Sequence, residues 1–389
     1  MNSAFRSAIT ITRRHLPKDL DRSWVQSIGD KDNRMSSGVA SDLETPRPSS
    51  GAAKKAAMLA AKLLVTGACF WYVSRQIDWR QALSTIPLLD WRWAALAILM
   101  AMLQIPLLGL RWRNIVDALT PDDPPMTRAD MIAATAVGVF FAQVLPSIAG
   151  EGVRAWLLVR LGNNWRKAVT SAVIDRGVGV GLLVAFGFVV LLLPSGLTAL
   201  GGYRDLVLVV YGALMLAGTL ALLLVPKVVP LLRRWRYSRW VATLAAEAYR
   251  VLLGPKGVAI LSIACLIHAL TIFIVWSVAR AQGLALPLAD AAVLFTIVIG
   301  VVIVPISIGG WGLRELAVIS LLAGYGVAPE RALLFSVCFG LALAIGSLPG
   351  ALVWLLYPFA PAQGSAERRE GEAVSAAATR APDAAPDIA

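Results

Sequence analysis

Two arginines and two glutamates in this sequence belong to a motif that occurs twice. The first copy is Ser-Ile-Ala-Gly-Glu-Gly-Val-Arg, ending at Arg154, and the second is Ser-Ile-Gly-Gly-Trp-Gly-Leu-Arg, ending at Arg314. Glu151 lies inside the first copy, and Glu315 follows the second. A guanidinium is a planar fork of N–H donors that matches a phosphate or a carboxylate. The arginines therefore predict contact with a phosphate, or salt bridges to nearby acids. The glutamates could hold the arginines, carry protons or meet a cationic headgroup.

Each copy interrupts an apolar segment, with Pro146 before the first and Pro305 before the second. Proline and clustered glycines disfavour a continuous helix, so each copy predicts an apolar helix, a break and a short helix. The arginine should lie in the first turn of that short helix, where free N–H groups attract anions. The glycines expected at the breaks are Gly150, Gly152, Gly309, Gly310 and Gly312.

Broken helices in lipid are tolerated only inside protein or beside a wet cavity. Two breaks at corresponding positions of two halves indicate the binding site of a transporter. The alternative is that the glycines only allow close helix packing and the arginines only extend to the membrane interface. The duplication favours the binding site.

The composition is that of a polytopic membrane protein. Of the 389 residues, 58% are hydrophobic and 15% are charged, against about 25% charged in soluble domains. The net charge of +12 comes from basic residues that flank apolar segments, which indicates membrane orientation rather than nucleic-acid binding. Three cysteines lie far apart within apolar runs, and there are only two histidines. We therefore expect no metal site, no disulfide framework and no cofactor.

The apolar pattern predicts an all-α polytopic membrane protein with about six full transmembrane helices and two inverted re-entrant hairpins. The hairpins span about 129–161 and 288–323, and two full crossings each would give the same topology. Residues 1–55 are predicted to be a disordered cytoplasmic segment, 56–358 the transmembrane domain, and 359–389 a disordered tail. Basic loops place both termini in the cytoplasm. The six spans are predicted at about 56–74, 93–110, 168–193, 206–225, 257–280 and 331–357.

Other charged residues fall within or beside these spans. Asp175 and Arg176 lie near the start of the third span, where they either face the interior and pair or form a pair at the interface. Arg111 and Arg113 are expected to end the second span. His268 lies near the middle of the fifth span, where a hydrogen bond between helices is favoured over proton relay.

Three segments resemble the signatures of a known family. They are the first motif with its proline and following helix, from Pro146 to Leu158; the stretch Val173-Ile-Asp-Arg176; and the second motif, from Pro305 to Glu315. Together they resemble the flippase-like transmembrane domain of lysylphosphatidylglycerol synthases, over about residues 56–358. Ser147-Ile148 stands where relatives often carry a glycine and a basic residue.

The resemblance implies an integral inner-membrane protein that handles lipids. In bifunctional members this domain translocates the aminoacylated lipid, and a separate soluble domain makes it. Residues 359–389 are too short for such a domain, so synthase activity is not carried over.

We predict a lipid transporter of the bacterial inner membrane that moves a phospholipid or an isoprenoid-type lipid between leaflets. The chain has no phosphate-binding P-loop motif, so no ATPase activity of its own is expected. The expected partners are a membrane lipid with a phosphate-bearing headgroup and enzymes of lipid synthesis. One alternative is a membrane-embedded lipid-modifying enzyme with Glu151, Asp175 or Glu315 as acid or base. The other is a non-transporting scaffold for lipid-synthesis enzymes.

Overall fold

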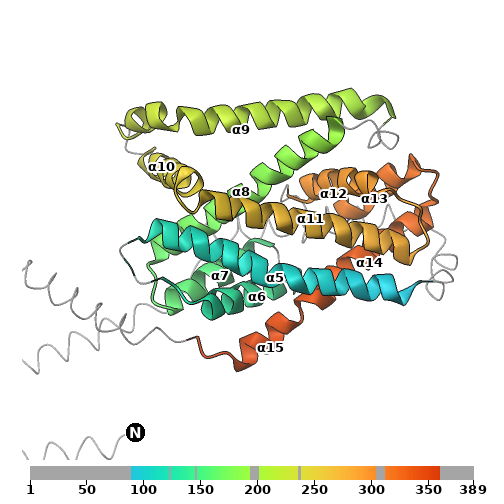
Figure 1. Cartoon of the computed structure of the whole chain (residues 1–389), viewed down its shortest axis with the longest axis horizontal. Helices are drawn as coiled ribbons and strands as arrows, with labels where there is room; N and C mark the ends of the chain where they lie inside the picture. Colours follow the sequence, from blue (N-terminus) through green and yellow to red (C-terminus); the bar gives the residue numbers. More distant parts are fainter. Residues whose placement is uncertain are drawn as a thin grey trace, which may run out of the picture. The chain divides into compact units, whose positions relative to one another are not determined.

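The computed structural model describes residues 89–121, 123, 125–144, 147–192, 201–234, 238–303 and 312–359, all within one unit of the chain, residues 60–389. These residues form helices and their connections, and no strand occurs among them (Figure 1). The predicted N-terminal segment, the predicted span at 56–74 and the tail from residue 360 lie outside the described residues.

In the part of the chain that the structure describes, five helices are long and apolar enough to cross a membrane, which confirms the prediction of an all-α polytopic membrane protein. They correspond to the predicted spans two to six. They are α5 (Trp91–Leu119), α8 (Trp165–Leu192), α9 (Arg204–Leu232), α11 (Gly257–Ala281), and α14 (Pro329–Ser347) continued by α15 (Pro349–Leu356).

Two pairs of shorter helices interrupt this series. The first pair is α6 (Arg128–Val144) with α7 (Ser147–Arg160), and the second is α12 (Leu288–Ile303) with α13 (Leu313–Ala323). The members of each pair pack against one another. At 1.5 Å per residue, α6 and α12 are each about 25 Å long, less than the roughly 30 Å of a bilayer's hydrocarbon core.

The break in the first pair is narrower than the sequence predicts. Helix α7 begins at Ser147, so Arg154 lies two turns inside the helix and not in its first turn. Gly150 and Gly152 are likewise helical residues and not part of a loop. The prediction fails here because a helical glycine costs only about 1 kcal/mol, which close packing of α7 on α6 can offset.

The second pair matches the prediction, since Arg314 is the second residue of α13. Gly312 precedes this helix with a φ of 86°, a conformation that glycine adopts without strain. Its N–H donates to Glu315 Oε2 at 2.6 Å, which satisfies one free donor of the helix start. Pro146, Pro305, Gly309 and Gly310 lie outside the described residues.

The helices form two repeats in the same order. The motif serines at 147 and 307 are 160 residues apart, and so are Arg128 and Leu288, the first residues of α6 and α12. This offset relates the series α5, α6, α7, α8 to the series α11, α12, α13, α14. The packing follows the same relation, because α5 contacts α14 as α11 contacts α8, and α6 contacts α14 as α12 contacts α8.

The two repeats run in opposite directions where α5 and α11 pack together along their lengths (Figure 1). At one end Asp90 N donates to Ala281 O at 2.8 Å, and we call this the Asp90 end. At the other, the Lys256 end, Lys256 Nζ donates to Asp117 Oδ2 at 3.1 Å. Midway, Gln104 Nε2 donates to Thr271 Oγ1 at 2.7 Å. The repeats are therefore inverted, as the sequence predicts.

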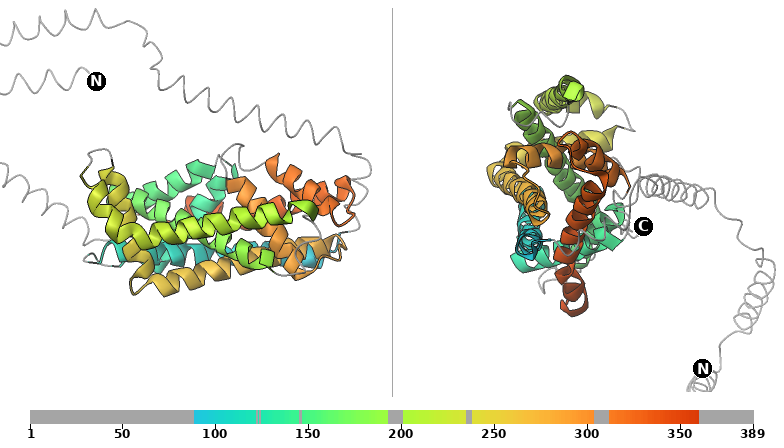
Figure 2. Two further views of the ribbon diagram at one scale, coloured as in Figure 1. Left: turned by 90° about the horizontal axis from the view of Figure 1, so that it is seen from above. Right: turned by 90° about the vertical axis from the view of Figure 1, so that its right-hand side faces the viewer.

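The remaining helices lie at the periphery (Figure 2). Helix α9 packs against α8, the short 3-10 helix η4 (Gly201–Tyr203) and α10 (Arg239–Leu253), on the side of the bundle opposite α15. Tyr357, just after α15, donates from its hydroxyl to Asp130 Oδ1 at 2.7 Å and fixes this segment to the start of α6.

Candidate functional site

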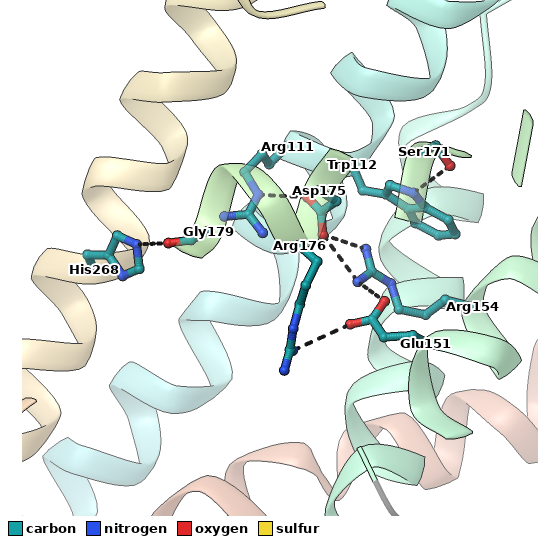
Figure 3. Close-up of polar contacts among 9 residues, drawn as sticks. All are labelled: Arg111, Trp112, Glu151, Arg154, Ser171, Asp175, Arg176, Gly179 and His268. Carbon is teal, nitrogen blue, oxygen red and sulfur yellow. Dashed lines mark hydrogen bonds and ion pairs between the residues drawn. The ribbon is translucent and has the colours of Figure 1, made fainter. Parts of the chain in front are cut away.

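Five charged side chains of the first repeat form one network, which we call the Asp175 cluster (Figure 3). Its members are Arg111 of α5, Glu151 and Arg154 of α7, and Asp175 and Arg176 of α8. Asp175 lies between two arginines: Oδ1 accepts from Arg111 Nε at 2.8 Å, and Oδ2 accepts from both terminal nitrogens of Arg154 at 3.2 Å. The network therefore joins the consecutive helices α7 and α8 to α5, which lies apart from them in the sequence.

Glu151 extends this network toward the exposed side of the cluster. Its Oε2 accepts from Arg154 Nη1 at 3.0 Å, and its Oε1 lies 3.9 Å from Arg176 Nη1. The side chain of Asp175 is 4% exposed, whereas those of Glu151 and Arg176 are 32% and 51% exposed. The cluster thus has a buried part, formed by Arg111, Arg154 and Asp175, and an exposed edge.

The Arg154 side chain also contacts an aromatic ring and a glycine of α6. Its guanidinium lies 4.3 Å above the Trp112 ring, and Trp112 Nε1 donates to Ser171 Oγ at 3.1 Å. A Cβ at position 138 would overlap Arg154 Cγ, so Gly138 provides the space for this side chain. Arg154 Nε is buried and has no hydrogen-bond partner among the described residues.

A bilayer centred on α5 would place the cluster within its hydrocarbon core. Helix α5 has 29 residues and is about 43 Å long, and Arg111 is about 12 Å from its end. A hydrocarbon core of roughly 30 Å centred on this helix would begin about 7 Å from either end. Charges at this depth are costly unless they pair or reach water. The pairs around Asp175 meet the first condition, and the exposed edge offers the second.

The charges of the cluster do not cancel. Three arginines and two carboxylates leave one excess positive charge. Asp175 offsets charge in the buried part, whereas Arg176 at the edge lies 3.9 Å from Glu151, its one ion-pair partner among the described residues. An anion at this edge would gain a charge-assisted hydrogen bond without unpairing Asp175.

The second repeat places its arginine in a different network. Arg314 donates to Glu315 Oε1 through Nε at 3.0 Å and Nη2 at 2.7 Å, and through Nε to Ser336 Oγ at 3.1 Å. Ser336 in turn donates to Glu315 Oε1 at 2.9 Å. All three residues are buried, and the charges of Arg314 and Glu315 cancel. This arrangement fixes the start of α13 against α14.

The two networks lie toward opposite ends of the bundle, as inversion requires. Arg331 Nη2, near the start of α14, donates to Gln282 O at 2.6 Å at the Asp90 end. Ser336 lies only five residues further along α14. The Asp175 cluster lies toward the Lys256 end, since Arg111 is six residues before Asp117.

The structure places the remaining sequence candidates as follows. Glu151, Arg154, Asp175 and Arg176 come together, and Arg314 and Glu315 form the separate second network. His268 Nε2 lies 3.0 Å from Gly179 O, between α11 and α8, as expected for the hydrogen-bonded alternative. Arg111 was not predicted as a site residue. Trp112, Ile115 and Val116 continue the buried apolar pattern beyond it, a sequence signal that the span does not end there.

Two glycines of the first motif provide a test of the α6–α7 packing. A Cβ at Gly150 would lie 2.7 Å from Gly138 O and 2.6 Å from Ala142 Cβ, whereas one at Gly152 would meet nothing within 4 Å. We expect Gly150→Ala to destabilise the protein by about 1–3 kcal/mol. Gly152→Ala should be neutral or stabilise it by up to about 1 kcal/mol. Thermal melting of the two purified variants beside the wild type checks this. Equal melting midpoints for the two variants would show that the helices do not approach so closely.

A comparison with protein families agrees with the motifs. The model of the lysylphosphatidylglycerol synthase transmembrane region matches residues 59–350, about three quarters of the chain. The chain belongs to this family. The residues matched to the lysylphosphatidylglycerol synthase transmembrane region include both networks. The match indicates a multi-pass membrane protein with a function related to membrane lipids. The transmembrane region is a non-catalytic part of the synthases.

No curated protein matches the chain. Among the described residues, no group of three or more His, Cys, Asp or Glu could hold a metal ion.

Proposed function

We propose that the chain moves a lipid with a phosphate-bearing headgroup between the two leaflets of the bacterial inner membrane. The observation that carries the proposal is the excess positive charge of the Asp175 cluster at membrane depth. Arg176 and Glu151 make this charge reachable from the exposed edge. A lipid phosphate is an anion, and its acyl chains can stay in the bilayer while the headgroup contacts this edge.

The inverted repeats support a transport path. In many secondary transporters, sites at the interface of two inverted repeats are exposed first to one side of the membrane and then to the other. Here the two repeats contact each other along α5 and α11, and α5 contributes Arg111 to the Asp175 cluster. Movement of α7 and α8 relative to α5 would change both the pairing of Asp175 and the exposure of Arg176.

The orientation follows from the distribution of basic residues. We place the Lys256 end in the cytoplasm, since the connection from α9 to α11 is rich in lysine and arginine. Helix α10, with exposed Arg239, Trp240 and Arg250, would then lie along the cytoplasmic membrane surface. Both chain termini would be cytoplasmic.

Leaflet exchange of fluorescent lipids in vesicles containing the purified protein tests the proposal. Phosphatidylglycerol and phosphatidylethanolamine carry the phosphate, whereas a glucosyl diacylglycerol has a bulky uncharged headgroup without one. We expect the protein to exchange the phosphate-bearing lipids at least about 10-fold faster than the sugar lipid, as the loss of one charged hydrogen bond predicts. Vesicles in which none of the three lipids exchanges faster than in protein-free vesicles would overturn the proposal.

A further inference from the structure

We propose that Glu151 binds a proton when a lipid phosphate takes its place on Arg154 and Arg176. This inference rests on the proposed function and concerns the same site. It assigns a proton-coupling role to one carboxylate and an energy source to the transport.

Glu151 occupies the donors that an incoming phosphate would use. Its two oxygens contact Arg154 Nη1 and approach Arg176 Nη1, at 3.0 and 3.9 Å. A phosphodiester resembles a carboxylate in presenting two oxygens that share one negative charge, and a guanidinium binds both groups in the same way. A lipid phosphate that reaches the exposed Arg176 would therefore compete directly with Glu151.

The same competition cannot occur at Asp175 or Glu315. Asp175 is buried between Arg111 and Arg154, so its displacement would leave the buried Arg111 without its ion-pair partner. Glu315 is 1% exposed and accepts hydrogen bonds from Gly312 N, Arg314 and Ser336. Of the three carboxylates in the two networks, only Glu151 is partly exposed, and it contacts arginines at the exposed edge of the Asp175 cluster.

When a phosphate displaces Glu151 from the arginines, the charges next to the Glu151 carboxylate change from positive to negative. The charged groups that face it are Arg154 on its own helix, Asp175 and Arg176 on α8, and Arg111 beyond Asp175 on α5 (Figure 3). On α6, Gly138 and Ala142 face α7, whereas Arg128 and Asp130 lie at the distant start of the helix.

With the site empty, the Glu151 carboxylate faces two guanidinium groups, those of Arg154 and Arg176. With a phosphate on those arginines, Glu151 would lie beside two anions, the phosphate and Asp175, and would favour the protonated form.

Coupling follows by thermodynamic reciprocity. If phosphate binding favours protonation of Glu151, then protonation favours phosphate binding by the same factor. One proton from solvent adds to the Glu151 carboxylate as the phosphate binds, and it leaves as the phosphate leaves. Release of lipid and proton on the other side would let a proton gradient drive the lipid across without ATP.

The number of protons taken up on binding tests this directly. Calorimetric titration of the detergent-solubilised full-length protein with dihexanoylphosphatidylglycerol, in two buffers of different ionisation enthalpy, gives both the affinity and the proton count. For the wild type we expect uptake of up to one proton per bound lipid. The affinity should rise by up to about 10-fold per unit of falling pH, the limit for one linked proton.

Two variants complete the test. Glu151→Gln mimics the protonated carboxylate and should bind at least as tightly as the wild type, without proton uptake or pH dependence. Glu247→Gln, on α10 and outside the cluster, should behave as the wild type. Wild-type binding without proton uptake would overturn the inference and leave the proposed transport intact, as would a folded Glu151→Gln that does not bind. Absence of both binding and leaflet exchange by the wild type would overturn the proposed function as well.

Discussion

Replacing Asp175 with asparagine should lower the melting midpoint of the purified protein by roughly 6–20 °C. Asp175 is the shared partner of Arg111 and Arg154, and all three side chains are buried. Removal of one partner from a buried ion pair costs about 3–5 kcal/mol, because the charge that remains is desolvated and unpaired. For a domain of this size, each kcal/mol corresponds to about 2–4 °C. Thermal melting in detergent, followed by the loss of monodisperse protein, measures the effect.

Two further variants separate this effect from the mere loss of a carboxylate. Asp205→Asn removes an exposed carboxylate at the start of α9 and should change stability by less than about 0.5 kcal/mol. Asp175→Asn combined with Arg111→Gln restores the net charge of the cluster and should recover part of the loss. If the Asp175→Asn protein had the same melting midpoint as the wild type, ion pairs would not be what stabilises the buried part of the cluster.

Replacing Arg154 with alanine should reduce leaflet exchange of phosphatidylglycerol about 10- to 100-fold while the protein still folds. Asp175 keeps Arg111 as a partner in this variant, so the carboxylate is not left alone. A charge-assisted hydrogen bond contributes about 1.5–3 kcal/mol, which corresponds to this range of rates. Arg154→Lys should recover little, because an ammonium cannot bridge Asp175 and Glu151 as the planar guanidinium does.

Arg250→Ala is the matched control, since Arg250 is exposed on α10 and is not a member of the cluster. We expect exchange by this variant at the wild-type rate. Arg314→Ala should act mainly on stability, because Arg314 is bonded internally to Glu315 and Ser336. Wild-type exchange by a well-folded Arg154→Ala protein would exclude the cluster as the transport site.

The sequence predicted the architecture well because its main signals are local. Apolar runs of about 20 residues and the flanking charges define helices that cross a membrane. The duplicated motif predicted two repeats, and basic loops predicted their inversion. The hydrogen bonds at both ends of the α5–α11 pair agree with that inversion.

The details of the first motif were less predictable, since they depend on packing between distant segments. Gly150 and Gly152 are helical because α7 lies directly on α6, which no local pattern reveals. The two copies were expected to hold equivalent arginines. In the structure, Arg154 pairs with Glu151 on its own helix and with an aspartate 21 residues later, on α8, whereas Arg314 pairs with the adjacent Glu315.

Arg111 shows the same limit most clearly. A basic residue after an apolar run normally marks the membrane interface, and that interpretation placed Arg111 at the end of a span. In the structure α5 continues to Leu119, and Arg111 is buried against Asp175 from another span. A pairing between residues 64 positions apart cannot be read from the local pattern of either segment.

The position of a bound phosphate tests the central claim most directly. An electron cryomicroscopy structure of the full-length protein with dioctanoylphosphatidylglycerol, determined beside one without lipid, would locate it. We expect phosphate oxygens within about 3 Å of guanidinium nitrogens of Arg154 and Arg176, the distance of charge-assisted hydrogen bonds, with the Glu151 side chain displaced. A headgroup bound elsewhere, with Glu151 still bonded to Arg154, would contradict the assignment of the Asp175 cluster as the lipid site.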